Sequence, residues 1–329
     1  MRGIDSACPQ PGPPTLVVVI DTEEEFDWSA PFDRGATSVE NIRHQPLAQA
    51  VMDRHGVVPA YVVDYAVAND TRAAGVLSAI AGAGRCEIGA HLHPWVNPPH
   101  AETVNVRHSF PGNLPPELER EKLRRLRDRI AEAFGKAPSI YKAGRYGIGP
   151  STYRILGELG FRIDASVVPH TDFSAEQGPD FRCFSPFPSR PSPQLVALPL
   201  SVHFVGLLHS AGAWLYPAVD SRLGRRLRAG GVLSRLGILE RLRLSPEGHS
   251  LGEMARQTRA AIAQGHRYFM MTWHSSSLLP GATQYVRTEA DRANFIAALD
   301  AYFRFFRESC GGRMAGVSEF AESLEGGPA

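Results

Sequence analysis

The predicted first strand and the acidic segment after it read Leu16-Val17-Val18-Val19-Ile20-Asp21-Thr22-Glu23-Glu24-Glu25. A short, uninterrupted run of branched apolar residues predicts a strand that is buried on both faces of a parallel sheet. Charged residues directly after such a strand lie at the carboxyl edge of the sheet, where α/β proteins place their active sites. The segment therefore predicts an α/β fold with an acidic site at the end of its first strand.

Strand and helix patterns alternate along most of the chain. The predicted strands are 15–20, 57–63, 86–91, 139–142, 162–168, 195–198, 267–273 and a last one at 314–317. The predicted helices are 42–54, 71–83, 117–134, 151–159, 245–264 and 289–307, and parts of 214–244 are also expected to be helical. This alternation predicts a parallel sheet with helical crossovers, and roughly seven strand–helix units favour a closed barrel over an open sheet.

We expect one domain rather than two. Residues 1–14 are predicted to be an N-terminal tail, and residues 15–325 carry the alternating pattern without a convincing boundary. Two long segments within the domain, 94–116 and 169–194, are rich in proline and are predicted to be irregular loops. Long loops in compact domains are often functional, so we expect both insertions to shape a substrate groove.

Composition gives no support for some classes of partner. The 35 basic residues nearly balance the 34 acidic ones, which gives no reason to expect nucleic acid or an anionic membrane. The first residues lack a signal-peptide pattern, and no apolar run is long enough to span a bilayer. The four cysteines are scattered and form no CxxC pair, so neither a disulfide framework nor a thiolate zinc site is indicated. We expect a cytoplasmic protein, and its oligomeric state stays open.

Five carboxylates fall within seven residues after the first strand, from Asp21 to Asp27. If the chain stays extended, Asp21 and Glu23 share one face while Glu24 points elsewhere. A divalent cation would relieve the repulsion, and a neighbouring carboxylate could act as a base toward an activated water. The alternative is a solvated acidic loop, which is less expected directly after a buried strand.

Two histidines, His91 and His93, follow the predicted strand 86–91. At positions i and i+2 of an extended segment, two imidazoles project to the same side and can bind one metal ion. Neutral imidazoles suit zinc and similar first-row ions. The alternative is a pair of loop histidines without a special role. Trp95, close by, could stack on a sugar ring, although packing is the simpler interpretation.

Three further residues lie near predicted strand ends. Arg145, between two glycines, could keep an acidic base ionised by charge pairing, or could be an ordinary surface arginine. Asp164 could orient an imidazole, or could serve a local turn. His274, after strand 267–273, is a candidate general acid for a leaving group, and a structural histidine is the alternative.

Taken in order, three phrases resemble the NodB-homology polysaccharide deacetylase family, and its WalW-like branch in particular. The phrases are Ile-Asp-Thr-Glu-Glu-Glu-Phe-Asp-Trp at 20–28, Glu-Ile-Gly-Ala-His-Leu-His-Pro-Trp at 87–95, and His-Ser-Ser-Ser-Leu-Leu-Pro-Gly at 274–281. The resemblance covers most of the chain, from the first strand to the last helix. It implies a distorted (β/α)7 barrel that uses a divalent metal to remove an N- or O-acetyl group from a carbohydrate.

The resemblance also implies roles for single residues. Asp21 matches the catalytic base of the family, and Glu23 is the better match for its metal-binding carboxylate. His91 matches the first metal-binding histidine. The family usually has a second histidine four residues later, where this chain has Trp95, and His93 is the candidate substitute.

The later motifs match less evenly. Arg145 matches the arginine of the third motif but lacks the proline that usually follows it, and Asp164 falls only loosely near the fourth motif. His274 matches the histidine that acts as the acid.

Sequence therefore predicts a hydrolase in which Glu23, His91 and His93 hold zinc or a similar divalent ion. Asp21 and His274 would move protons, while Arg145 and Asp164 would support these two residues. The substrate would be an acetylated carbohydrate.

Two alternatives remain open. One is a metal-independent amidohydrolase that cleaves a C–N bond in a small substrate. The other is a barrel that binds carbohydrate without turnover.

Overall fold

A computed structural model describes residues 12–324 of the chain. Most of the predicted tail, residues 1–14, lies outside these residues, as do Cys8 and the predicted domain end at residue 325. The division into a tail and one domain therefore stays a prediction. Within the described residues, no helix is both long enough and apolar enough to cross a membrane.

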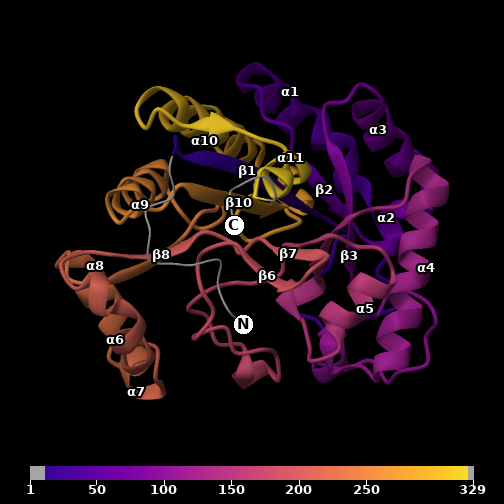
Figure 1. Ribbon diagram of the computed structural model, residues 1–329, viewed down its shortest axis with the longest axis horizontal. Coiled ribbons are helices and arrows are strands. Elements are labelled where there is room, and N and C mark those ends of the chain that lie inside the picture. The colour runs from indigo at the N-terminus through magenta and orange to yellow at the C-terminus, as the bar shows by residue number, and fades with distance from the viewer. Residues whose placement is uncertain (1–11, 325–329) are drawn as a thin grey trace.

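A curled sheet of nine strands forms the centre of the molecule (Figure 1). Its strand order is β10–β1–β2–β3–β4–β5–β7–β6, and β11 also pairs with β1. Every pairing is parallel except that of β6 with β7. The strands are β1 (Thr15–Thr22), β2 (Ala60–Val63), β3 (Glu87–Leu92), β4 (Ile140–Ala143), β5 (Ile163–Asp164), β6 (Ser189–Ser192), β7 (Leu195–Ala197), β10 (Tyr268–His274) and β11 (Arg313–Met314).

Helices surround the outside of this sheet (Figure 1). They are α1 (Gln45–His55), α2 (Tyr65–Asn69), α3 (Thr71–Gly82), α4 (Pro116–Phe134), α5 (Thr152–Glu158), α9 (Leu251–Ala263) and α10 (Glu289–Glu308). A last helix, α11 (Val317–Ser323), packs Val317 and Phe320 against the inner face of the sheet instead. Along β1, Leu16 and Val18 join an apolar layer shared with the outer helices, while Val17 and Val19 join a second layer inside the curl. Side chains alternate between the faces of a strand, so both faces of β1 are buried as predicted.

The sheet is curled but not closed by its own strands, since β10 and β6 do not pair with each other in residues 12–324. A separate hairpin, β8 (Val202–Val205) with β9 (Glu240–Arg243), lies beside β10. Its flanking residues bond to that strand: Met270 N donates to Ser201 Oγ at 2.8 Å, and Thr272 N donates to Leu244 O at 3.3 Å. The predicted α/β barrel-type fold is confirmed in this distorted form.

The predicted helix 245–264 begins too early. Ser245-Pro246-Glu247 is a common helix-start pattern, but α9 begins at Leu251, with Ser250 as the N-cap in a reciprocal capping box with Glu253. Residues 245–250 are a loop instead, and Glu247 within it is buried. The segment 214–244 divides into α6 (Gly212–Val219), α7 (Arg222–Arg226), α8 (Ala229–Arg235) and β9.

Candidate active site and metal centre

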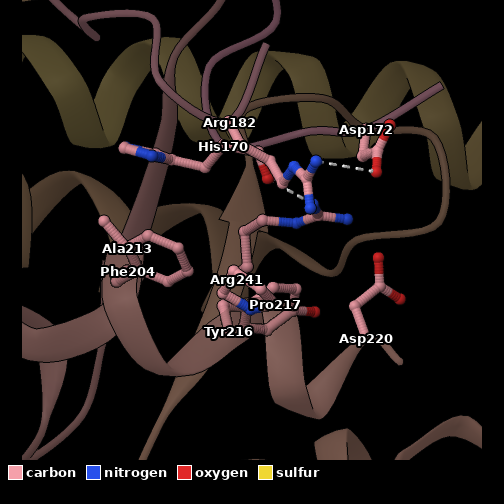
Figure 2. Close-up of a pocket in the computed structure, with 9 residues that line it drawn as sticks. All are labelled: His170, Asp172, Arg182, Phe204, Ala213, Tyr216, Pro217, Asp220 and Arg241. Atoms are coloured by element: carbon pink, nitrogen blue, oxygen red, sulfur yellow. Dashed lines mark hydrogen bonds and ion pairs between the residues drawn. The ribbon is translucent and has the colours of Figure 1, made fainter. Parts of the chain in front are cut away.

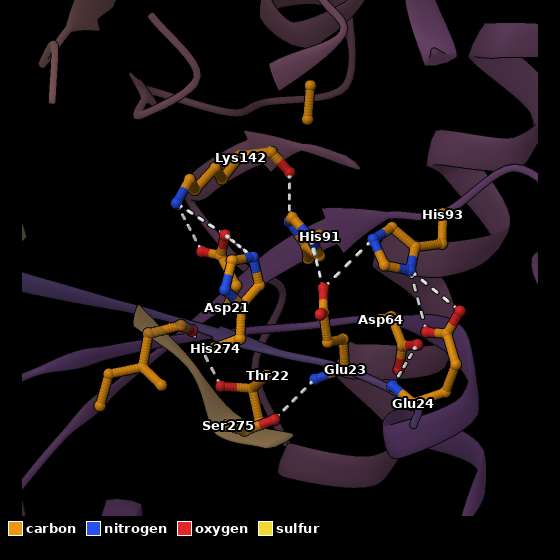
Figure 3. Close-up of polar contacts among 12 residues, drawn as sticks. Asp21, Thr22, Glu23, Glu24, Asp64, His91, His93, Lys142, His274 and Ser275 are labelled. Atoms are coloured by element: carbon orange, nitrogen blue, oxygen red, sulfur yellow. Dashed lines mark hydrogen bonds and ion pairs between the residues drawn. The ribbon is translucent and has the colours of Figure 1, made fainter. Parts of the chain in front are cut away.

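The carboxyl ends of the parallel strands open on a cavity of about 1100 Å³. Asp21 and Glu23 reach it from the end of β1, His91 and His93 from β3, and His274 from β10. Asp21 and His274 are register partners in the β1–β10 pair. The structure thus brings together five of the seven site residues that the sequence predicted (Figure 3).

Glu23, His91 and His93 form a buried cluster with the spacing of a metal site (Figure 3). One carboxylate oxygen, Glu23 Oε2, lies 3.2 Å from His91 Nε2 and 3.3 Å from His93 Nε2. The second imidazole therefore comes from His93. Trp95 is almost fully buried, lies against the His93 ring at 4.3 Å between centroids, and donates its indole N–H to Glu24. It packs, as the simpler interpretation held.

Hydrogen bonds on the far side of each imidazole determine which nitrogen carries the proton. His91 Nδ1 lies 2.9 Å from the carbonyl oxygen of Lys142, which can only accept, so Nδ1 is the protonated nitrogen. His93 Nδ1 lies 2.9 Å from Glu24 Oε2 and donates to it in the same way. Asp64 lies behind Glu24 and accepts its backbone N–H at 3.2 Å, and burial raises the pKa of Asp64 well above its ordinary value.

Glu23 Oε2, His91 Nε2 and His93 Nε2 consequently face one another, and each can offer a lone pair to a cation. Burial lowers the pKa of His93, which keeps that ring neutral, and among residues 12–324 its Nε2 has no hydrogen-bond partner. One carboxylate and two neutral imidazoles are a common donor set for zinc and related divalent ions. The residues present fit a divalent metal, and Lys142 O and Glu24 orient the two rings from behind.

Lys142 is the cationic partner of Asp21. Its Nζ lies 2.6 and 2.8 Å from the two carboxylate oxygens and donates a third bond to Thr272 Oγ1 at 2.9 Å. Burial by itself would raise the pKa of Asp21, but the charge and hydrogen bonds of Lys142, with the charge of His274, lower it to about 2. Sequence reasoning missed this lysine, although a lone charge in the buried strand β4 signals a buried partner.

Arg145 does not contact Asp21, so the predicted charge pairing is wrong. Its guanidinium donates to Ser109 Oγ at 2.6 Å, pairs with Glu176, and lies over the ring of Phe110 at 4.1 Å from the centroid. Arg145 also lines the cavity. Arg145 therefore joins the two long loops to the end of β4 rather than tuning the acid at the end of β1.

His274 is held by a carboxylate that sequence reasoning also missed. Its Nδ1 lies 2.8 Å from Glu247 Oε2, and its backbone N–H donates to the other oxygen of Glu247 at 3.0 Å. Burial alone would lower the pKa of His274, but Glu247, with Glu23 and Asp21, raises it well above the ordinary value. His274 Nε2 lies 3.7 Å from Asp21 Oδ2. The ring is thus a positively charged group beside the ionised aspartate.

Asp164 lies away from these residues, so the prediction that it orients an imidazole is also corrected. It is buried at the end of β5, where it accepts from Ser166 Oγ and, at 3.4 Å, from Tyr153. Burial raises its pKa to about 7. The bonds of Asp164 hold together β5 and α5, and the carboxylate beside the His274 imidazole is that of Glu247.

The rest of the cavity wall carries aromatic and cationic side chains. They include Trp28, Phe110, Tyr146, Phe173, Tyr285, Arg243 and Arg287. Aromatic side chains together with a few converging polar groups are typical of a binding cavity for an organic ligand. The predicted loops 94–116 and 169–194 contribute Phe110 and Phe173, as expected for segments that shape a groove.

A second hollow lies between loop 169–194 and α6, and it is far smaller (Figure 2). It holds only about 20 Å³, which is room for a single water. Two arginines cross it: Arg241 donates to the carbonyl oxygen of His170 at 2.6 Å, and Arg182 pairs with Asp172 at 3.5 Å. The Arg241 bond fastens the loop to β9, and the pair of Arg182 with Asp172 lies within the loop itself. The space is too small for a sugar.

Comparisons with known proteins rest on structure alone, because no family model and no curated protein matches the sequence. A presumed polysaccharide deacetylase from Mycobacterium smegmatis is similar at 18% identity and a TM-score of 0.53, over 96% of this chain and 92% of that one. A 4-alpha-glucanotransferase from Thermococcus litoralis has the same TM-score, at 10% identity over 94% of this chain and 40% of that one. A family 4 acetyl xylan esterase from Clostridium thermocellum reaches a TM-score of 0.45 at 13% identity, over 95% and 93% of the two chains.

Proposed function

We propose that this protein is a metal-dependent hydrolase that removes an N- or O-acetyl group from a carbohydrate. The observation that carries the proposal is the meeting of one carboxylate and two imidazole ligand atoms with Asp21 and His274 on one large cavity. The fold likeness to a presumed polysaccharide deacetylase supports it. Since a glucanotransferase is equally similar in fold, the proposal depends on the site and not on the fold.

Glu23, His91 and His93 would hold the metal, with zinc as our first choice for a site of one carboxylate and two imidazoles. When bound, a divalent ion would polarise the acetyl carbonyl and activate water as a nucleophile. The wide cavity leaves room for a carbohydrate beside this cluster, and its aromatic wall offers flat apolar faces to sugar rings.

Asp21 orients the attacking water and takes its proton. The pairing with Lys142 keeps this carboxylate ionised throughout the neutral range, because its pKa is lowered to about 2. Lys142 also holds the carboxylate in one orientation, since it bonds to both oxygens and to Thr272. The fixed geometry is what a general base needs before its substrate arrives.

His274 donates the proton that the leaving nitrogen or oxygen needs. The carboxylates around it keep the ring protonated, and Glu247 holds Nδ1 so that Nε2 faces the cavity. Hydrolysis then balances, because water gives one proton to Asp21 and the leaving atom receives one from His274. The 3.7 Å between the two side chains allows Asp21 to return its proton to His274 afterwards.

Metal analysis and an acetate-release assay test the proposal together. We expect the purified protein to release acetate from N-acetylglucosamine oligomers or from acetylated xylan, to stop when a chelator is added, and to recover when zinc is restored. His91→Ala should lose metal and at least about a hundredfold in activity, since the metal supplies several kcal/mol of transition-state stabilisation. His100→Ala, which changes an exposed loop histidine, is the matched control.

The other outcomes identify the alternatives. Cleavage of a small amide that survives the chelator and the His91→Ala change would establish the metal-independent amidohydrolase. Glycan binding without acetate release under any divalent metal would establish the non-catalytic barrel. Either result contradicts the proposed function.

A further inference from the structure

Residues 206–239, here called the helical arm, stand apart from the helices that cover the sheet (Figure 1). The arm contains α6, α7 and α8 and connects the two strands of the β8–β9 hairpin. Its helices contact one another and the hairpin. The proposed hydrolysis assigns no task to this part of the chain.

The helical arm exposes an unusual amount of apolar surface. Of the twelve exposed large apolar side chains among the described residues, seven belong to the arm. They are Leu207, Leu208, Trp214, Leu223, Leu227, Val232 and Leu236. Leu207 and Trp214 are 81% and 80% exposed. Leu223 and Leu227, and likewise Val232 and Leu236, are four residues apart and so lie on one side of their helical turns.

The helical arm has no core of its own in which these apolar side chains are packed. The three helices have 8, 5 and 7 residues, and helices this short are not stable in water without packing. Only Gly212, Gly224 and Leu239 are fully buried within 206–239. Exposed apolar patches of this kind mark an interaction surface.

Charge indicates what covers this surface. The helical arm has five arginines at positions 222, 225, 226, 228 and 235 and one acidic residue, Asp220. Asp220 lies 3.8 Å from Arg225, and the described part of the chain has no acidic side chain paired with the other four arginines. The arm therefore carries a concentrated positive charge, although the whole chain has a formal charge of only +1.

We propose that the helical arm binds the surface of an anionic lipid bilayer. Arginines interleaved with leucine, valine and tryptophan suit such an interface, because the guanidinium groups meet lipid phosphates while the apolar side chains enter the headgroup boundary. A second copy of this chain is a poorer occupant, since two arms of like charge would repel each other. A fluid bilayer also accepts projecting side chains without a matching groove. The overall charge balance gave no hint of this surface, because the acidic residues lie elsewhere in the chain.

Vesicle cosedimentation of the full-length protein tests the proposal. We expect binding to vesicles of phosphatidylcholine mixed with phosphatidylserine, little binding to phosphatidylcholine alone, and a decline with added salt. The triple change Arg222→Gln, Arg225→Gln, Arg226→Gln should weaken binding by roughly a hundredfold, because each basic residue near an anionic surface contributes severalfold. A matched triple on α3 and α10, Arg72→Gln, Arg304→Gln, Arg307→Gln, should leave binding unchanged.

A second pair of measurements tests the apolar contribution and the competing occupants. Leu223→Ser with Leu227→Ser should also release the protein from anionic vesicles, while its circular dichroism stays that of the unchanged protein. The proposal is overturned if anionic vesicles never bind, if neutral vesicles bind equally well, or if the arm variants bind like the control. It is also overturned if light scattering shows a dimer that the leucine variant converts to monomer, because the arm then covers a second copy.

Discussion

A buried lysine sets the charge of the residue proposed as the base. Lys142 extends from β4, its Nζ bonds to both oxygens of Asp21, and both side chains are almost fully buried. Removing one partner of such a pair leaves the other charge buried and uncompensated. The cationic partner of Asp21 is therefore Lys142, which is held by the packing of the strands. Arg145 instead contacts the two long loops, 94–116 and 169–194.

Lys142→Met should move the acid limb of the pH profile of kcat/KM to higher pH. The proposed reaction requires ionised Asp21, whose pKa is held at about 2 against an ordinary 3.8, and removing the lysine lets burial raise this pKa. Below the raised pKa the base is protonated and activity falls. Arg145→Gln is the control and should leave the acid limb in place. An acid limb that moves equally in both variants would refute the assignment of Lys142.

Glu247→Gln should shift the basic limb to lower pH. His274 must be protonated to act as the acid, and Glu247 contributes the largest attraction that raises its pKa. With a neutral amide in place, His274 loses its proton at a lower pH, so activity is lost earlier as the pH rises. A fall of about 10- to 100-fold at neutral pH is typical for loss of an orienting partner. Asp164→Asn, which changes a carboxylate without an imidazole neighbour, should keep the basic limb where it was.

At the scale of elements, the site follows from where the strands end. The strand β1 could be predicted because a strand that is buried on both faces is apolar throughout and shows no alternation of apolar and polar residues that could be misinterpreted. The residues that follow a parallel strand must lie at the carboxyl edge of the sheet. The same logic found Glu23, His91, His93 and His274 from their places in the sequence. It required no knowledge of which strand lies beside which.

Partners that depend on strand order could not be predicted in this way. Lys142 meets Asp21 only because β4 curls toward β1 across the interior of the sheet, and Glu247 meets His274 only because the β8–β9 hairpin returns beside β10. A proline after Ser245 is a common helix start, and tertiary contacts to Glu247 keep this segment a loop. Local propensity carries no information on such long-range contacts.

Gly144→Ala tests how closely the ends of β3 and β4 must approach. A methyl group there would press on the carbonyl oxygen of Leu92 and would lie 2.5 Å from His93 Cδ2. We expect the displaced imidazole to weaken zinc binding by about tenfold and the fold to lose about 1–3 kcal/mol. Gly157→Ala is the matched control, because a methyl group there meets nothing within 4 Å inside α5, and it should stabilise slightly. Unchanged zinc affinity in Gly144→Ala would contradict this account of the site.

At the scale of the whole molecule, the proposed metal connects the ends of β1 and β3, two elements far apart in the sequence. Without a cation, the ligand atoms of Glu23, His91 and His93 repel one another inside the protein.

Anything that binds only the folded chain stabilises it, by about 2.7 kcal/mol at a hundredfold excess over Kd. Zinc should therefore raise the Tm of the unchanged protein and of His100→Ala by several degrees, but not that of His91→Ala, as followed by circular dichroism. Equal shifts in all three proteins would mean that zinc binds elsewhere, whereas a shift confined to the proteins with His91 would identify the cluster without any assay of activity.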